Sequence, residues 1–141
     1  MSVTRRIWNY LVDRSSTKPT VSLRIANLTR QSELAHCAGI ADHGSKRRTG
    51  LLDRETLSSG EGLWIVPCEG VHTFGMKFPI DLVYLDRKKR VRKIRHAVPP
   101  RRISICLAAH SVVELPAGTI RRTQTRPGDK LEFADASPAL R

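Results

Sequence analysis

The sequence predicts an α+β domain that is rich in β-strands, mostly antiparallel, arranged as a barrel or a sandwich with one or two short helices. One observation is that short alternating or wholly apolar segments recur along the chain, separated by Gly, Pro, Asn and Asp. Another is that the 141 residues are 40% hydrophobic and 27% charged, a size and composition that fit one folded domain.

The first elements lie in the N-terminal half. Val21–Leu28 predicts a half-buried strand, because Val21, Leu23 and Ile25 fall on one face and polar or small residues on the other. Gln31–Thr49 is compatible with a helix, since its apolar residues recur every three to four positions.

The middle of the chain predicts the core of the sheet. Gly62–Pro67 is typical of a buried strand that ends at its proline. Ile80–Asp86 is apolar on both faces except at Asp81, which predicts a central strand buried on both sides. After a turn at Arg87–Arg90, Val91–Val98 returns as the second strand of a hairpin.

The C-terminal part predicts two more strands and a short helix. Ser111–Leu115 and Lys130–Phe133 have strand composition. Thr119 is placed to cap a helix over Ile120–Thr125.

These elements set the predicted domain organisation, which is an N-terminal extension over residues 1–20, a single β-rich domain over 21–133 and a tail over 134–141. The apolar run near the N-terminus is interrupted by Asn9 and closed by Asp13, so it is too short and too polar for a signal sequence or a membrane-spanning helix. The three cysteines include no CxxC pair, which favours free thiols in a reducing compartment. We therefore expect a soluble, cytoplasmic protein.

The net charge is strongly positive. The chain has 25 Lys and Arg residues against 13 Asp and Glu residues, a formal charge of +12. Such an excess favours an anionic partner, although a basic surface without a partner has the same composition.

Several motifs occur in a fixed order along the chain: GLLDRETL, GEGLWIVPCEGVHTFGMKFPIDLVYLD, RVRKI, VVELPAGT and GDKLEF. Together, over the stretch Val21–Phe133, they resemble the uncharacterised family called domain of unknown function 192. The resemblance implies a compact, mostly antiparallel β domain of bacteria and archaea with no known catalytic activity. It also implies a link to pilus or secretion systems, because some relatives are encoded beside such genes.

The sequence departs from many relatives in two ways. It shows no secretory signal or lipoprotein anchor. Gly75 and Phe78 stand where many relatives have an aromatic residue and an asparagine beside the central Met-Lys pair. The version with Pro-Cys before the histidine therefore resembles a subgroup of the family.

The densest mixture of apolar and polar side chains lies between Cys68 and Asp81, and we predict a site for a ligand or a protein partner there. The candidate residues are Cys68, His72, Phe74, Met76, Lys77, Asp81 and Glu114. A small pocket lined by His72, Phe74, Met76 and Lys77 would combine an apolar floor with a few polar groups.

Two chemical alternatives share this segment. Cys68, His72 and Met76 are spaced four residues apart and supply soft ligands suited to copper or a similar ion. Cys68 could instead act as a nucleophile with His72 as its base. Cysteine and methionine are also common core residues, so we expect neither a metal nor any other cofactor.

Asp81 and Glu114 lie inside apolar strands, and a buried charge needs partners. Lys77, Arg54 and backbone N–H groups are the candidates for Asp81. A structural polar network is favoured over an acid/base or ligand-holding pair with an altered pKa, because ion-pair networks form without chemistry.

The stretch Arg87–Arg95 (RKKRVRKIR) carries seven cations in nine residues. These cations, which could bind the phosphates of nucleic acid or another anionic surface, are Arg87, Lys88, Lys89, Arg90, Arg92, Lys93 and Arg95. A solvated hairpin edge that resists aggregation has the same composition.

The sequence thus favours a non-enzymatic binding or accessory module that uses Cys68–Asp81. Binding of nucleic acid or an anionic surface through Arg87–Arg95 is one alternative. A small enzyme or soft-metal protein built on Cys68, His72 and Met76 is the other.

Overall fold

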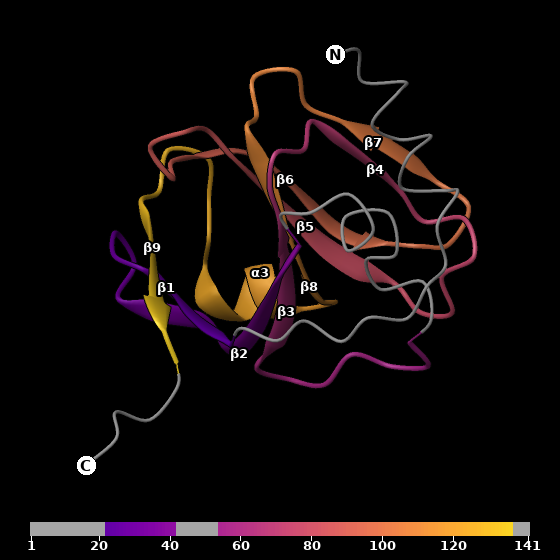
Figure 1. Cartoon of the computed structure of the whole chain (residues 1–141), viewed down its shortest axis with the longest axis horizontal. Helices are drawn as coiled ribbons and strands as arrows, with labels where there is room; N and C mark the ends of the chain where they lie inside the picture. Colours follow the sequence, from indigo (N-terminus) through magenta and orange to yellow (C-terminus); the bar gives the residue numbers. More distant parts are fainter. Residues whose placement is uncertain (1–21, 42–53, 137–141) are drawn as a thin grey trace.

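A seven-stranded sheet curls into a half-barrel, and a two-stranded sheet packs beside it (Figure 1). The computed structural model describes residues 22–41 and 54–136. The elements within these residues are β1 (Leu23–Asn27), β2 (Ser32–Ala41), β3 (Glu61–Ile65), β4 (Gly70–His72), β5 (Ile80–Leu85), β6 (Val91–Val98), β7 (Ile103–Ile105), β8 (Ser111–Pro116), α3 (Thr119–Thr123) and β9 (Leu131–Asp135). No helix among them is long and apolar enough to cross a membrane.

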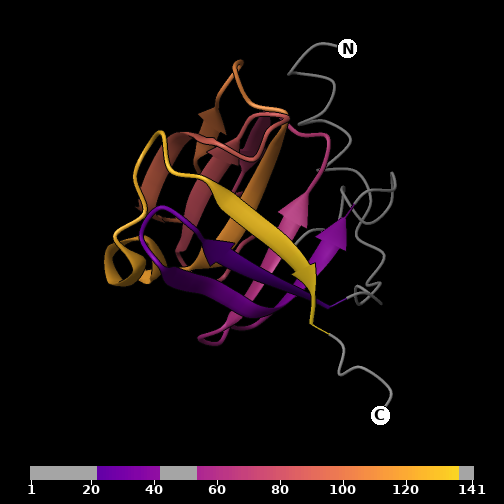
Figure 2. The ribbon, with the colours of Figure 1, turned by 90° about the vertical axis from the view of Figure 1, so that its left-hand side faces the viewer.

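The large sheet has the strand order β6-β5-β8-β3-β2-β1-β9. The β2–β3 pair is parallel and the other neighbouring pairs are antiparallel. Its two end strands approach each other through a bridge between Arg90 and Lys130, and the N–H of Leu131 donates to the carbonyl of Lys89 at 2.9 Å. Figure 2 shows the side formed by β1, β2 and β9, where the sheet curls round.

The central strands carry a hydrophobic core on each face. The core on the face that the small sheet covers, which we name the β4/β7 core, consists of Ala41, Leu57, Leu63, Ile65, Cys68, Val71, Met76, Ile80, Leu82, Tyr84, Val98, Ala109 and Val112. The barrel core, inside the curled sheet, consists of Ile25, Leu34, Ala35, Ala38, Val83, Leu85, Val91, Val113, Leu115, Ile120 and Leu131. Successive residues of a strand point to opposite faces, which is why Leu82 and Tyr84 enter one core while Val83 and Leu85 enter the other.

The prediction of a central strand buried on both sides is confirmed by β5. All six of its residues are buried, and it lies between β6 and β8. The predicted hairpin is confirmed as well, because β5 and β6 pair in antiparallel fashion across the Arg87–Arg90 turn.

The predicted helix over Gln31–Thr49 is wrong for the part that the structure describes, because Ser32–Ala41 forms β2. Leu34, Ala38 and Ala41 are buried and recur at helical spacing, but the β1–β2 pairing contains register shifts. A bulge adds a residue and changes the phase of the alternation, so a bulged strand can imitate a helical period. Residues 42–49 lie outside the described residues.

The short C-terminal helix is confirmed as α3, with a different cap. Thr119 was expected to cap it, but the N-cap residue is Gly118, which has a φ of 97° and makes no side-chain capping bond. Thr119 belongs to the helix, and its hydroxyl donates to the carbonyl of Pro116 at 2.8 Å. The predicted extension over residues 1–20 and most of the tail over 134–141 lie outside the described residues.

Candidate functional site

The candidate segment Cys68–Asp81 runs through β4 to the start of β5, and β4 pairs with β7 over the β4/β7 core. Val71 and Ser104 face each other in this pair, and both are buried. The hydroxyl of Tyr84 in β5 donates to Ser104 Oγ at 2.9 Å. Burial raises the pKa of Tyr84 far above its usual range. The small sheet is therefore fixed to the central sheet by apolar packing and by the buried contact between Tyr84 and Ser104.

Cys68 is a buried member of the β4/β7 core. Its thiol donates to the carbonyl of Gly70 at 3.1 Å, and its N–H donates to the carbonyl of His110 at 2.8 Å. Reactive cysteines lie in exposed, electropositive positions, unlike this one. The setting of Cys68 favours a structural role over nucleophilic catalysis.

His72 is also buried, and its ring lies 5.9 Å from that of Phe74. Its Nδ1 accepts the N–H of Phe74 at 3.2 Å. Burial lowers the pKa of His72 from 6.5 to about 4, so the imidazole is neutral near pH 7. A neutral, buried imidazole that accepts a backbone N–H shapes the start of the loop after β4.

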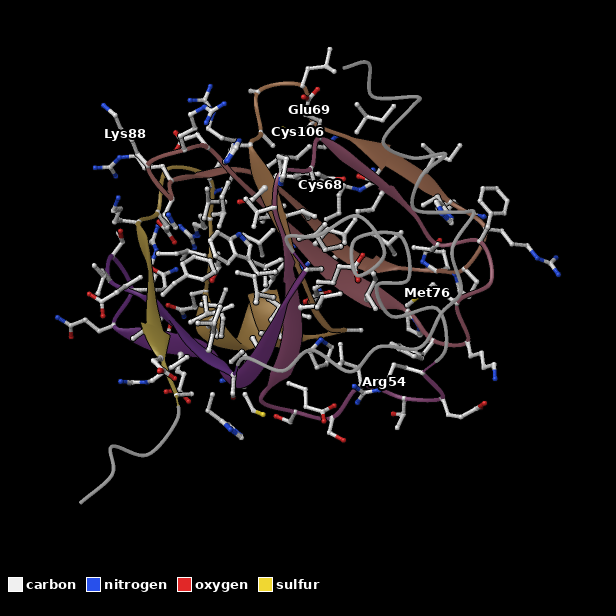
Figure 3. The ribbon with its side chains drawn as sticks, in the orientation of Figure 1. Arg54, Cys68, Glu69, Met76, Lys88 and Cys106 are labelled. Carbon is white, nitrogen blue, oxygen red and sulfur yellow. The ribbon has the colours of Figure 1, made fainter. Side chains whose placement is uncertain are left out.

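The third proposed metal ligand, Met76, is buried in the β4/β7 core and stands apart from Cys68 in Figure 3. Within residues 22–41 and 54–136, no group of three or more His, Cys, Asp or Glu side chains is placed to hold a metal ion. The soft-metal hypothesis for Cys68, His72 and Met76 gains no support from this geometry.

Asp81 finds its partners in the backbone. Its Oδ1 accepts the N–H of Ala97 at 2.7 Å, and its Oδ2 accepts those of Gly118 at 3.1 Å and Ile120 at 2.9 Å. Three donors compensate the buried carboxylate and tie β5 to the end of β6 and to the start of α3.

The two cationic candidates for Asp81 lie elsewhere. Lys77 is exposed and pairs with Glu55, and Arg54 pairs with Glu61 at 2.7 Å. Of the three kinds of partner proposed for Asp81, the backbone N–H groups are the ones that the structure provides.

Glu114 in β8 is buried beside Leu82 of β5 and Leu63 of β3 in the strand register. It therefore lies on the face of the central sheet that carries Tyr84, and its charge contributes to raising the pKa of that tyrosine. Asp81 points to the opposite face, so the two carboxylates do not form an acid/base pair.

The exposed side chains of this region form an apolar surface. We name it the β7 patch, and it consists of Phe74 (43% exposed), Ile103 (55%), Ile105 (41%) and Leu107 (72%). Ile103 and Ile105 share one face of β7, and Ile103 lies opposite His72, whose ring contacts Phe74. Large exposed apolar side chains that occur together in one region of the surface are typical of interaction sites.

Three of these four residues were absent from the predicted site. Ile103, Ile105 and Leu107 alternate with Ser104 and Cys106, a pattern typical of a strand. That pattern alone would place the isoleucines on the core side, yet Ser104 points inward to Tyr84 and the isoleucines point outward. The alternation could have revealed the strand but not which face is exposed.

The basic stretch Arg87–Arg95 does not present a single charged face. Lys89 Nζ lies 5.4 Å from the ring centroid of Trp64 and 5.9 Å from that of Phe133. Lys93, by contrast, extends toward the small sheet and donates to the carbonyl of Ile105 at 2.8 Å. Lys89 and Lys93 therefore lie on different sides of the hairpin.

Taken together, the fold and the exposed patch define a curled β-domain with a candidate binding surface on its small sheet. The chain belongs to the family called domain of unknown function 192, described as "Uncharacterized ACR", whose model matches residues 26–133. No curated protein matches the chain.

Two crystal structures share the fold. One is a Sinorhizobium meliloti 1021 protein proposed to be a transcription regulator, which is 23% identical, with a TM-score of 0.73 over 84% of this chain and 98% of that chain. The other is a protein of unknown function from Novosphingobium aromaticivorans DSM 12444, which is 18% identical, with a TM-score of 0.69 over 84% of this chain and 95% of that chain. At these identities the similarity shows the fold alone.

Proposed function

We propose that the protein is a non-enzymatic binding module whose β7 patch binds apolar protein segments that also carry acidic residues. The observation that carries this proposal is the gathering of four large exposed apolar side chains, Phe74, Ile103, Ile105 and Leu107, beside the Cys68–Asp81 segment. An exposed apolar cluster costs solvation free energy unless a partner covers it.

The acidic character of the partner follows from the charges around the patch. Arg101 and Arg102 are exposed directly before β7, and Lys93 reaches its other end. The whole chain carries a net charge of +12. Complementary charge speeds encounter and disfavours basic partners.

Binding fits the buried polar residues better than catalysis does. Backbone donors engage both oxygens of Asp81, His72 is neutral and buried, and Cys68 lies in the β4/β7 core. A general base or nucleophile has to reach its substrate, and all three of these side chains are buried.

The test is a selection of random displayed peptides on the immobilised protein. We expect enrichment of peptides that combine apolar residues with Asp or Glu. A variant with Ile103→Asn and Leu107→Asn should bind the selected peptides at least about tenfold more weakly, because the apolar contact area is lost.

Leu28→Asn is the matched control. Leu28 is also a large exposed apolar residue, at 49%, but it lies at the β1–β2 turn, away from β7 (Figure 1). Binding should survive this change. Selected peptides that bind the patch variant as tightly as the parent would show that the proposed function is wrong.

A second candidate function, binding of nucleic acid or another polyanion by Arg87–Arg95, is favoured by one observation. Of the seven cations there, Arg92 alone forms an ion pair, at 3.8 Å to Asp86, within the part of the chain that the structure describes. Affinity for duplex DNA should fall steeply with salt, and neutralising Arg87, Lys88 and Arg90 should flatten that dependence. An affinity that does not change with salt would exclude this function.

The location that we propose is the cytoplasm, where thiols stay reduced. Cys37, Cys68 and Cys106 are free cysteines. Fractionation of the native host should find the chain with cytoplasmic markers, and recovery outside the cytoplasm would contradict this assignment.

A further inference from the structure

The strand β7 has one edge engaged by β4 and one edge turned away from it. Gly70, Val71 and His72 lie opposite Ile105, Ser104 and Ile103, respectively. Just beyond these pairs, the N–H of Thr73 donates to the carbonyl of Arg102 at 2.8 Å, and the N–H of Cys106 donates to the carbonyl of Glu69 at 2.7 Å.

In an antiparallel pair, residues alternate between those that bond to the neighbouring strand and those whose main chain points away from it. Arg102, Ser104 and Cys106 therefore turn their N–H and carbonyl groups toward β4. Ile103 and Ile105 turn theirs to the opposite edge. Among the described strands, β7 pairs with β4 alone.

One carbonyl on the outer edge of β7 already has a hydrogen-bond donor. Lys93 Nζ donates to the carbonyl of Ile105 at 2.8 Å. A lysine on an edge carbonyl is a common way to discourage strand pairing, and a charged ligand can displace it. The N–H groups of Ile103 and Ile105 and the carbonyl of Ile103 point along the same edge.

The two faces of a strand added at this edge would meet different surfaces. One face would continue the β7 patch beside Ile103 and Ile105. The other would lie over β6, where Lys93 and Arg95 sit opposite Tyr84 and Leu82 and so point toward the side of the sheet that β7 covers. Apolar residues suit the first face and acidic residues the second.

We propose that β7 binds an extended acidic peptide as an additional β-strand, with apolar side chains on the β7 patch and carboxylates beside Lys93 and Arg95. This inference rests on the proposed function and names its partner class and binding mode. Strand addition takes affinity from main-chain hydrogen bonds and specificity from alternate side chains. An alternating peptide matches both the edge and the charge of this surface.

The probe is the fluorescein-labelled peptide Glu-Val-Glu-Ile-Glu-Val-Glu, measured by fluorescence anisotropy on the full chain. Two versions are compared, with N-methyl groups on the Val and Ile amides or on the internal Glu amides. Only alternate amides of an added strand face its neighbour, so one version should lose at least about tenfold in affinity while the other stays within about threefold.

A pair of protein variants tests the same edge from the other side. Ile105→Pro removes an N–H that points away from β4, whereas Ile105→Thr also shortens the apolar side chain but keeps the N–H. The proline variant should bind at least about tenfold more weakly than the threonine variant. If the proline variant does not fold, the comparison of the two methylated peptides still tests strand addition on the parent protein.

The outcomes separate the two proposals. Equal effects of the two methylated peptides, or no binding of the unmodified probe, would overturn strand addition. Selected library peptides that still depend on Ile103 and Leu107 would leave the proposed function standing in that case. A chain that sediments as a dimer, and becomes monomeric with Ile105→Pro, would show that a second copy occupies the edge and would overturn the choice of an acidic peptide.

Discussion

The hydroxyl of Tyr84 donates a 2.9 Å hydrogen bond to Ser104 Oγ, which places the Ser104 side chain on the face of β7 that covers the central sheet. Because Ser104 points to the central sheet, Ile103 and Ile105 must point to the solvent. A buried polar contact in the core thereby sets the chemistry of the surface above it.

The first prediction concerns the energy of that contact. Tyr84→Phe should destabilise the protein by about 1–2 kcal/mol, because it removes one hydrogen bond and leaves the Ser104 hydroxyl buried. Combined with Ser104→Ala, it should show a coupling energy of about 1 kcal/mol in urea denaturation. Strictly additive effects of the two substitutions would mean that the hydrogen bond contributes nothing.

The second prediction concerns Asp81. Asp81→Ala leaves three buried N–H groups without this acceptor, those of Ala97, Gly118 and Ile120. It should lower the free energy of unfolding by about 3–5 kcal/mol. Asp81→Asn retains one acceptor oxygen and should cost less. Unfolding by urea gives both free energies.

Glu55→Gln is the control for Asp81. Glu55 is exposed and pairs with the exposed Lys77, and such surface pairs contribute about 0–1 kcal/mol. The change should therefore be close to neutral. An Asp81→Asn variant as stable as the parent would show that the carboxylate is not the anchor of α3.

Much of the sheet could be predicted from local pattern. The wholly apolar run Ile80–Leu85 and the alternating run Leu23–Asn27 form strands where the sequence predicts them. Their burial follows from the period-2 geometry of a strand. The pattern failed for Ser32–Ala41, because bulges shifted its apolar residues to helical spacing.

The candidate site was only partly predictable, because its surface depends on contacts distant in sequence. Phe74 and Lys77 are exposed, whereas Cys68 and Met76 are core residues. Nothing in the sequence around Ile103 shows that the apolar residues of β7 point outward. The contact that holds Ser104 inward joins it to Tyr84, which is 20 residues away in the sequence. Backbone partners such as those of Asp81 are likewise invisible until the fold brings them together.

The third prediction is a pH dependence from His72. Burial lowers the pKa of His72 to about 4, while the unfolded chain keeps its ordinary value of 6.5. Between these two pH values the unfolded state binds a proton that the folded state does not, so stability decreases as the pH falls. The stabilisation that the neutral His72 contributes to the folded state is fully present above pH 6.5, and it amounts to at most about 3 kcal/mol.

The measurement is the urea midpoint at several pH values for the parent, His72→Gln and the control His96→Gln. Glutamine keeps an acceptor for the N–H of Phe74 but does not titrate. His72→Gln should flatten the pH dependence of the urea midpoint between pH 4 and 6.5, and the same substitution at the exposed His96 is the control. If both variants keep the slope of the parent, His72 is not the titrating group.

The last prediction separates two effects at Lys89, which has a φ of 64° and lies over the rings of Trp64 and Phe133. Lys89→Ala keeps the left-handed backbone and removes the cation, so it should cost about 0.5–1 kcal/mol. Lys89→Gly also removes the cation, but it relieves the backbone by about 1 kcal/mol. The glycine variant should therefore be close to the parent in stability and more stable than the alanine variant by about 1 kcal/mol in urea denaturation. If the glycine and alanine variants are equally stable, the turn adjusts its backbone conformation. If the parent is no more stable than the alanine variant, the contacts of Lys89 with the two rings contribute nothing to stability.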